Sequence, residues 1–149
     1  MSVGEFCNRE VVVADRETTI LEAAKLMRWH HVGDVIVTEA RDNQQVPVGI
    51  LTDRDIVVEL LAEEIDLSML CVGDAMSFEL LIANESDDLL DAVERMRDRG
   101  VRRVPVVNAE GGLAGILTLD DMLEVFAEQL SDMVRLVSNE HHVERERRV

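Results

Sequence analysis

One pattern occurs twice in the chain, as Gly49-Ile50-Leu51-Thr52-Asp53-Arg54-Asp55 and as Gly115-Ile116-Leu117-Thr118-Leu119-Asp120-Asp121. Each copy reads glycine, two apolar residues, threonine, two variable residues and aspartate. The apolar run indicates a strand, and apolar residues at helical spacing follow, so the pattern marks a strand-to-helix junction. Glycine at its head allows another group to approach the backbone closely. The chain therefore contains the same junction twice.

The similarity extends outward from the two junctions. Upstream, a shift of 69 positions places Val3-Gly4 on Val72-Gly73 and Met27-Arg28 on Met96-Arg97. Removing three residues from the loop at 41–45 brings the two motifs into register. About sixteen identities over roughly fifty aligned positions compare with about four expected from composition, so the repeat is an internal duplication.

Each copy contains the same order of predicted elements. A short strand (11–13 or 80–82) precedes a helix whose candidate N-cap is Thr18 or Asp87. Two further strands (35–37 and 48–51, or 104–107 and 113–117) enclose a turn, and a second helix follows. The sequence thus predicts an α+β fold of two βαββα units packed about a pseudo-twofold axis, with equivalent clefts between them. The expected divisions are residues 1–66, 67–130 and a C-terminal extension, 131–149.

The last predicted helix is longer than the repeat requires. Its apolar stripe consists of Leu123, Phe126, Leu130, Met133, Val134 and Val137. The stripe ends in a charged tail, 140–149. Either self-association or folding back onto its own domain would cover this stripe, and the sequence leaves both open.

The threonine and aspartate of the motif have two interpretations. Thr-x-x-Asp resembles a capping box, in which the two side chains bind helix N-terminal amides. Alternatively, a carboxylate accepts hydrogen bonds from the vicinal diol of a sugar and repels a phosphate. Because two copies are expected to face each other across a cleft, we assign Asp55 and Asp121 to a ribose.

The stretch from Arg95 to Arg103 holds five of the fifteen basic residues. It is either a solvated helix face or a phosphate-binding cluster. Arg102 and Arg103 follow the helix and are better placed to reach a cleft. The first repeat has Gly33-Asp34 at these positions and lacks the counterpart of Pro105. The clefts are therefore expected to differ, with the second repeat as the better phosphate receiver.

Composition argues against several functional classes. The formal net charge is −16 and only 3% of residues are aromatic, which disfavours nucleic acids and anionic membranes. No apolar run approaches the length of a spanning helix, and no signal peptide is evident. Cys7 and Cys71 fit no metal or redox spacing, which favours reduced thiols in the cytoplasm and leaves a bridge between them open. No nucleophile–base arrangement or metal-ligand spacing is present, so neither an enzyme nor a metal site is expected.

The tandem pattern resembles the cystathionine-β-synthase (CBS) domain pair, the Bateman module, over nearly the whole chain. The resemblance rests on the lead-in Val-Gly-Asp-Ala-Met-Ser at 72–77, on Arg103-Val104-Pro105-Val106-Val107 and on both motifs. It implies a regulatory module, commonly a homodimer, that binds an adenosine-containing ligand: AMP, ADP, ATP, S-adenosylmethionine or an NAD-type molecule. The candidate ligand-binding residues are Thr52, Asp53, Arg54, Asp55, Arg102, Arg103, Pro105, Thr118, Asp120 and Asp121. The threonines and aspartates would hold ribose, and Arg103 would contact phosphate.

Two alternatives to ligand sensing follow from the residues. The repeat could serve only as a ligand-free scaffold for dimerisation or for a partner protein, since Asp34 suggests that one cleft has lost its role. Nucleic-acid binding through Arg95–Arg103 is the other alternative, and the acidic net charge opposes it.

Overall fold

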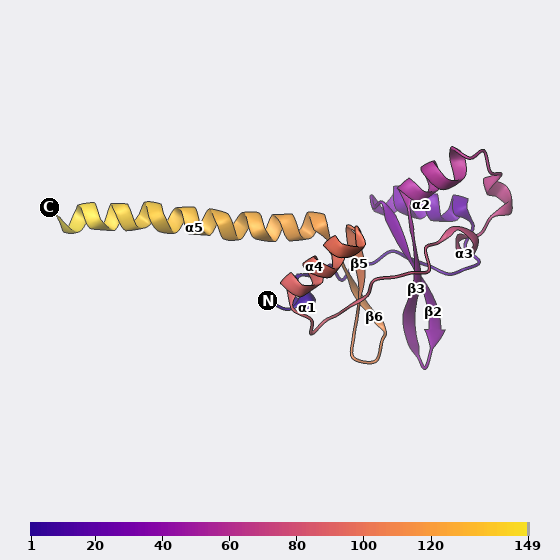
Figure 1. Cartoon of the computed structure of the whole chain (residues 1–149), viewed down its shortest axis with the longest axis horizontal. Helices are drawn as coiled ribbons and strands as arrows, with labels where there is room; N and C mark the ends of the chain where they lie inside the picture. Colours follow the sequence, from indigo (N-terminus) through magenta and orange to yellow (C-terminus); the bar gives the residue numbers. More distant parts are fainter. Residues whose placement is uncertain (149) are drawn as a thin grey trace.

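Each half of the chain forms a three-stranded sheet covered by helices, in the order that the duplication predicts (Figure 1). The computed structural model describes residues 1–148. Its first half contains α1 (Val3–Phe6), β1 (Val13–Ala14), α2 (Ile20–His30), β2 (Asp34–Arg41), β3 (Gln44–Thr52), η1 (Asp55–Leu61) and η2 (Leu67–Met69). Its second half contains α3 (Val72–Ala75), β4 (Ala83–Asn84), α4 (Leu89–Arg99), β5 (Arg103–Val107), β6 (Leu113–Thr118) and α5 (Leu119–Arg147).

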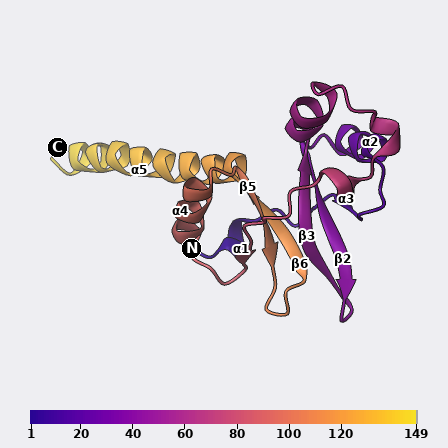
Figure 2. The same ribbon diagram turned by 45° about the vertical axis from the view of Figure 1, so that its right-hand side comes forward.

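The two sheets share one topology and lie side by side (Figure 2). In each sheet the short first strand pairs in parallel with the middle strand, which pairs antiparallel with the third strand. The pairings Val35–Leu51 and Val104–Leu117 are equivalent in the two copies. All four residues are at most 1% exposed, which places the two cores under the predicted apolar strands. The predicted α+β duplication is confirmed.

The helices begin one residue later than predicted. Thr19 caps α2 by accepting a bond from the Glu22 amide, and Glu22 binds the Thr19 amide in return. Asp88 caps α4 through the Leu90 amide. The predicted cap Thr18 belongs to the preceding turn, where its amide binds Asp15. A flanking polar residue competes for the same role, so spacing alone does not fix a cap.

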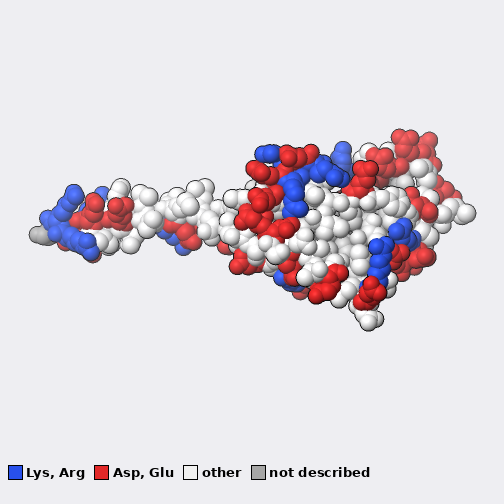
Figure 3. All heavy atoms as spheres, turned by 60° about the horizontal axis from the view of Figure 1, so that its bottom comes forward, with Lys and Arg blue, Asp and Glu red and all other residues white. Residues whose placement is uncertain are grey.

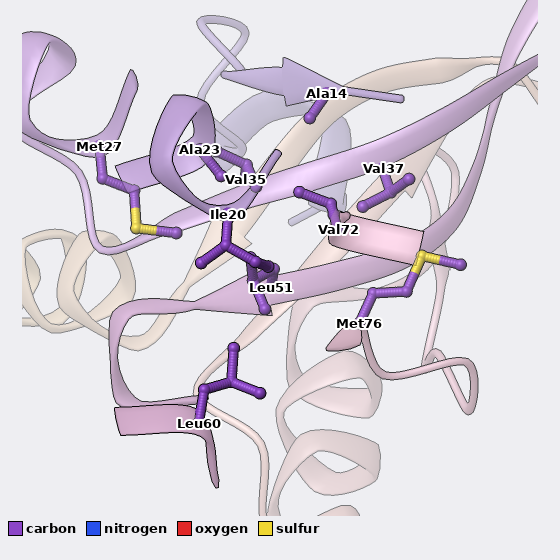
Figure 4. Packing of buried hydrophobic residues seen from close by; sticks show 10 residues of the cluster. All are labelled: Ala14, Ile20, Ala23, Met27, Val35, Val37, Leu51, Leu60, Val72 and Met76. Carbon is purple, nitrogen blue, oxygen red and sulfur yellow. The ribbon is translucent and has the colours of Figure 1, made fainter. Parts of the chain in front are cut away.

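Each core is completed by a turn from the other repeat. Val72 and Met76, at the start of the second repeat, pack in the core of the first half (Figure 4). Val3, at the start of the first repeat, packs in the core of the second half. The predicted division between residues 66 and 67 follows the sequence repeat. In the folded chain, the two lead-in turns, α1 with the residues up to Asn8 and α3 with the residues up to Ser77, each pack on the opposite half.

The exchanged turns cross the motif glycines. The Asn8 amide and carbonyl both bond Ile116, and Ser77 makes the same two bonds to Ile50. A β-carbon on Gly115 would lie 2.7 Å from the Cys7 sulfur and 2.8 Å from the Asn8 carbonyl oxygen. A β-carbon on Gly49 would contact only the flexible side chain of Met76. The close approach predicted at the glycines is therefore made by the chain itself.

Helix α5 has 29 residues and projects away from both sheets (Figure 1). Met122 is its buried residue, and from 127 onward nearly every described residue is exposed. The tail predicted from residue 140 is helical through Arg147, and its last residue, Val149, lies outside the described residues. The helix does not fold back onto its own domain. Within residues 1–148, no helix is both long and apolar enough to cross a bilayer.

The two motif glycines provide a matched test of the crossing. Gly115→Ala should lower the free energy of unfolding by about 1–3 kcal/mol, because the backbone at Asn8 must move. Gly49→Ala should cost less, since the methionine side chain adapts to the added methyl group. Urea unfolding of the two variants checks the order, and a larger loss for Gly49→Ala would contradict it.

Candidate functional site

A cleft of about 280 Å³ lies between the two halves of the molecule. Four segments line it: the lead-in to β1, the turn from α2 to β2, the start of β5, and the junction of β6 with α5. The lining residues are Asn8, Glu10, Val11, Val12, His31, Val32, Gly33, Asp34, Arg102, Arg103, Ile116, Thr118, Leu119, Asp120 and Asp121. Both repeats contribute, so the cleft forms only when the halves are packed together.

The second motif reaches this cleft through the end of β6. Thr118 caps α5, and its hydroxyl accepts a bond of 3.1 Å from the Asp121 amide. The carboxylate of Asp121 does not complete a capping box with any residue in the described part of the chain. It is therefore available at the cleft wall, next to the threonine.

The first motif is used differently. The Asp55 carboxylate accepts a 2.9 Å bond from the Thr52 amide, and the Thr52 hydroxyl accepts a 3.1 Å bond from the Asp55 amide. This reciprocal pair is a complete capping box, and it caps the helical residues 53–54 that lead into the π-helical segment η1. The two interpretations of Thr-x-x-Asp thus apply to different copies: capping describes Asp55, and a carboxylate at a cleft describes Asp121.

The remaining predicted site residues divide in the same way. Arg102, Arg103 and Asp120 line the cleft, whereas Asp53 and Arg54 do not belong to its lining. Pro105 is fully buried in β5, where it pairs with Ile116 of β6. The structure thus gathers the candidates of the second repeat and leaves those of the first outside this cleft.

An ion pair joins the two halves at the cleft. The Arg103 guanidinium lies 3.8 Å from Asp34 and donates a 3.0 Å bond to the Gly33 carbonyl. The Asp34 side chain is only 13% exposed, and one of its oxygens lacks a hydrogen-bond partner among the described residues. Burial raises the pKa of Asp34, while Arg103 lowers it and Asp53 raises it. A buried carboxyl therefore depends on a cation from the other repeat.

The same arginine distinguishes the two pseudo-equivalent sites. Asp34 and Arg103 occupy matching positions in the duplication, and the Gly33 carbonyl that Arg103 binds also accepts a bond from the Asp53 amide, which places the guanidinium beside the first motif as well as at the cleft. There, Arg99 also donates a 3.2 Å bond to the carbonyl of Glu79, the counterpart of Glu10. Arginine side chains thus cover backbone on the side of the first motif, in line with the expected inequivalence.

The basic cluster at 95–103 is largely neutralised by neighbouring acids. Its ion pairs are Arg95–Asp87, Arg97–Asp98, Arg102–Asp120 and Arg103–Asp34. A cluster whose members are paired has little free positive charge to attract a nucleic-acid backbone. This pairing weakens the nucleic-acid alternative.

Several cleft residues were not identified from the sequence. Asn8, Glu10 and the two valines after them reach the cleft only because the lead-in crosses to the other half. His31 lies at the left-handed C-cap of α2, with a φ of 54°, where the second repeat has Gly100. The sequence analysis did not assign His31 to the cleft that it lines. In the alignment of the two repeats, His31 falls on Gly100, and a histidine where the other copy has glycine was the sequence feature that could have drawn attention to it.

The Asp34–Arg103 pair predicts a pH-dependent effect on stability. A raised pKa means that the folded state binds the proton more tightly, so stability falls as pH rises from about 3.8 towards the raised value. Arg103→Gln removes the positive charge that lowers the pKa of Asp34, so stability should continue to fall up to a higher pH. At neutral pH we expect a loss of about 1–3 kcal/mol in the free energy of unfolding.

Urea unfolding at about pH 4.5 and pH 7.5 measures the difference. The double variant Asp34→Asn/Arg103→Gln is the control, because it has no titratable carboxyl at position 34. An equal loss in Arg103→Gln at both pH values would contradict the assignment.

Comparison with known proteins identifies the duplicated unit. The CBS domain model matches residues 3–62 and 72–128. The chain is 34% identical over 84% of its length to the uncharacterized protein MK0525 of Methanopyrus kandleri, and it spans 62% of that protein. It is 37% identical over 81% of its length to the CBS domain-containing protein YhcV of Bacillus subtilis, spanning 82% of that relative.

A solved structure shows the same arrangement. The CBS domain protein PAE2072 of Pyrobaculum aerophilum, complexed with AMP, is 30% identical and superposes with a TM-score of 0.73. The superposition covers 81% of this chain and 89% of that one. The chain belongs to the CBS domain family, as a pair of CBS repeats.

Proposed function

We propose that this CBS pair is a regulatory module that binds an adenosine-containing ligand in the cleft between its repeats. The observation that carries the proposal is the pairing of Thr118 with an uncommitted Asp121 carboxylate at that cleft. The AMP complex of PAE2072 supports the ligand class. The free thiols of Cys7 and Cys71 favour a cytoplasmic setting.

The lining of the cleft suits a nucleoside. Asp121 is an acceptor for the ribose hydroxyls, as the sequence suggested. Val11, Val12, Val32 and Ile116 provide apolar surface from both halves, on which a base can be buried. We assign regulation to the module, and not catalysis, because these groups bind and orient without offering a paired nucleophile and base.

Binding at this place would affect both halves and the long helix together. The ligand would contact the lead-in to β1, the α2–β2 turn and the first turn of α5 at once. A ligand shifts a conformational equilibrium only through contacts that differ between the two states. A site divided among these segments provides such contacts, and a partner protein would sense the resulting change.

We further propose that α5 pairs with the α5 of a second copy. Leu123, Phe126, Leu130, Met133 and Val137 recur at alternating spacings of three and four, the pattern of a helix–helix seam. The four aliphatic residues are 53–63% exposed. Many uncharged side chains lie along the projecting helix between its root and its charged tip (Figure 3). In proteins, most of a helix's stability comes from packing of its apolar face, so the exposed seam calls for a partner.

Charge favours an antiparallel pair. Residues 119–134 carry five acidic side chains and no basic one, whereas residues 135–148 carry four arginines and three glutamates. Parallel helices would place the two acidic segments against each other. Antiparallel helices place each acidic segment against the slightly basic segment of the partner, which reduces repulsion across the seam.

A second candidate function is a ligand-free dimerisation or interaction scaffold. It is favoured by the arginine contacts that cover the side of the first motif. The open cleft on the other side favours ligand sensing instead, and measurement of binding separates the two.

Alanine substitutions at the two motif aspartates test the ligand proposal. Asp121→Ala should weaken ligand binding at least about tenfold, because a charged hydrogen-bond acceptor is lost. Asp55→Ala is the control: it should cost about 1 kcal/mol of stability through the lost capping bond and leave binding unchanged.

Thermal shift with AMP, ATP, S-adenosylmethionine and NAD gives the measurement. Ligand at about 100 times its dissociation constant adds about 2.7 kcal/mol, which is several degrees at this chain length. The absence of a shift with all four ligands at millimolar concentration would refute ligand sensing in this class and favour the scaffold.

The proposed dimer is tested on the projecting part of α5. Leu130→Lys places a charge in the seam and should convert dimers to monomers. Asn139→Lys adds the same charge to the opposite face of the helix and should leave the dimer intact. Sedimentation equilibrium distinguishes the two, and a Leu130→Lys protein that stays dimeric would place the interface elsewhere.

A further inference from the structure

We infer that the cleft selects adenosyl ligands without net negative charge, either neutral nucleosides or adenosyl compounds with a cationic group, over nucleoside polyphosphates. This inference rests on the proposed function and narrows its ligand class. It departs from the sequence-based expectation that Arg103 receives a phosphate, since the structure gives that arginine another partner.

The charges that line the cleft are predominantly negative. Four carboxylates, from Glu10, Asp34, Asp120 and Asp121, face two guanidinium groups, from Arg102 and Arg103. The whole chain has a net charge of −16, so the long-range field has the same sign. Such a cleft concentrates cations and repels anions.

Each arginine already has an acidic neighbour that a phosphate would have to compete with. Arg103 is held by Asp34 and by the Gly33 carbonyl. If a phosphate drew Arg103 away, the carboxyl of Asp34 would be left without its counter-ion in a 13%-exposed position, which opposes the exchange. Arg102 lies 3.5 Å from Asp120 in a solvent-exposed pair, and its charge is balanced at close range.

The N-terminus of α5 does not compensate for this deficit. A helix start usually attracts anions through its free amides and its dipole. Here the Leu119 amide binds the Arg102 carbonyl, and the Asp121 amide binds the Thr118 hydroxyl. Two aspartates in the first turn, Asp120 and Asp121, oppose the positive end of the dipole. A phosphate at this helix start would meet two carboxylates.

The volume of the cleft favours the same ligands as its charge does. Its volume of about 280 Å³ lies just below the range for small-molecule sites, about 300–1,000 Å³. A nucleoside with a short substituent suits this volume better than a nucleoside with a triphosphate chain.

Isothermal titration calorimetry with a charge-graded series of adenosyl ligands tests the inference. S-adenosylmethionine has one net positive charge, and S-adenosylhomocysteine lacks only the methyl group and with it the sulfonium charge. AMP and ATP carry progressively more negative charge. Affinity should fall in that order, with ATP at least about tenfold weaker than S-adenosylhomocysteine at low salt. The spread should shrink as ionic strength rises.

Variants isolate the contribution of the cleft. Asp120→Asn removes one carboxylate and frees Arg102, so it should narrow the gap between ATP and S-adenosylhomocysteine several-fold. Asp91→Asn makes the same charge change on the exposed start of α4 and should leave the gap unchanged. An equal effect of both variants would assign the selection to overall charge and refute the role of the cleft.

The remaining outcomes separate this inference from the proposed function. If ATP binds as tightly as the uncharged ligand or more tightly, charge selection is refuted and adenosyl sensing stands. If no member of the series binds, the proposed function fails, and this inference fails with it.

Discussion

The packing of the molecule depends on the crossing of its two lead-in turns. Each turn bonds to the third strand of the other repeat, Asn8 to Ile116 and Ser77 to Ile50. A half of about 60 residues buries little surface and is marginally stable alone, and here each half borrows apolar side chains from the other. The same crossing carries Glu10 and its valine neighbours to the cleft. Folding and formation of the site therefore depend on the same contacts.

The duplication and the order of elements were predictable from the sequence, and the exchange was not. Strand and helix periodicity reports which face of an element is buried, but it does not report which neighbour buries it. Val3 and Val72 read as ordinary apolar residues in equivalent positions, and only the packed structure assigns each to the opposite core. The prediction that the motif glycines allow a close approach to the backbone holds at Gly115, where another segment of the chain lies too near to admit a β-carbon.

The site was predicted in part, because identical motifs have different surroundings. Thr52 with Asp55 and Thr118 with Asp121 share sequence spacing, yet one pair closes a reciprocal cap and the other does not. The helix that follows differs as well: η1 is a short π-helical segment, and α5 is a long α-helix. Arg103 was correctly placed at the cleft, but its partner Asp34 comes from residues distant in sequence. Side-chain pairing across the repeats is a property of the assembled halves.

Helix α5 has its first turn at the cleft and is about 43 Å long, at a rise of about 1.5 Å per residue. Because its own chain contacts it only near its root, a rotation of about 10° at Thr118 would carry the tip through about 7 Å, if the helix moves as a rigid rod. Small adjustments at the root are thereby geometrically amplified at the tip. A docked molecule there would experience a displacement larger than any within the sheets.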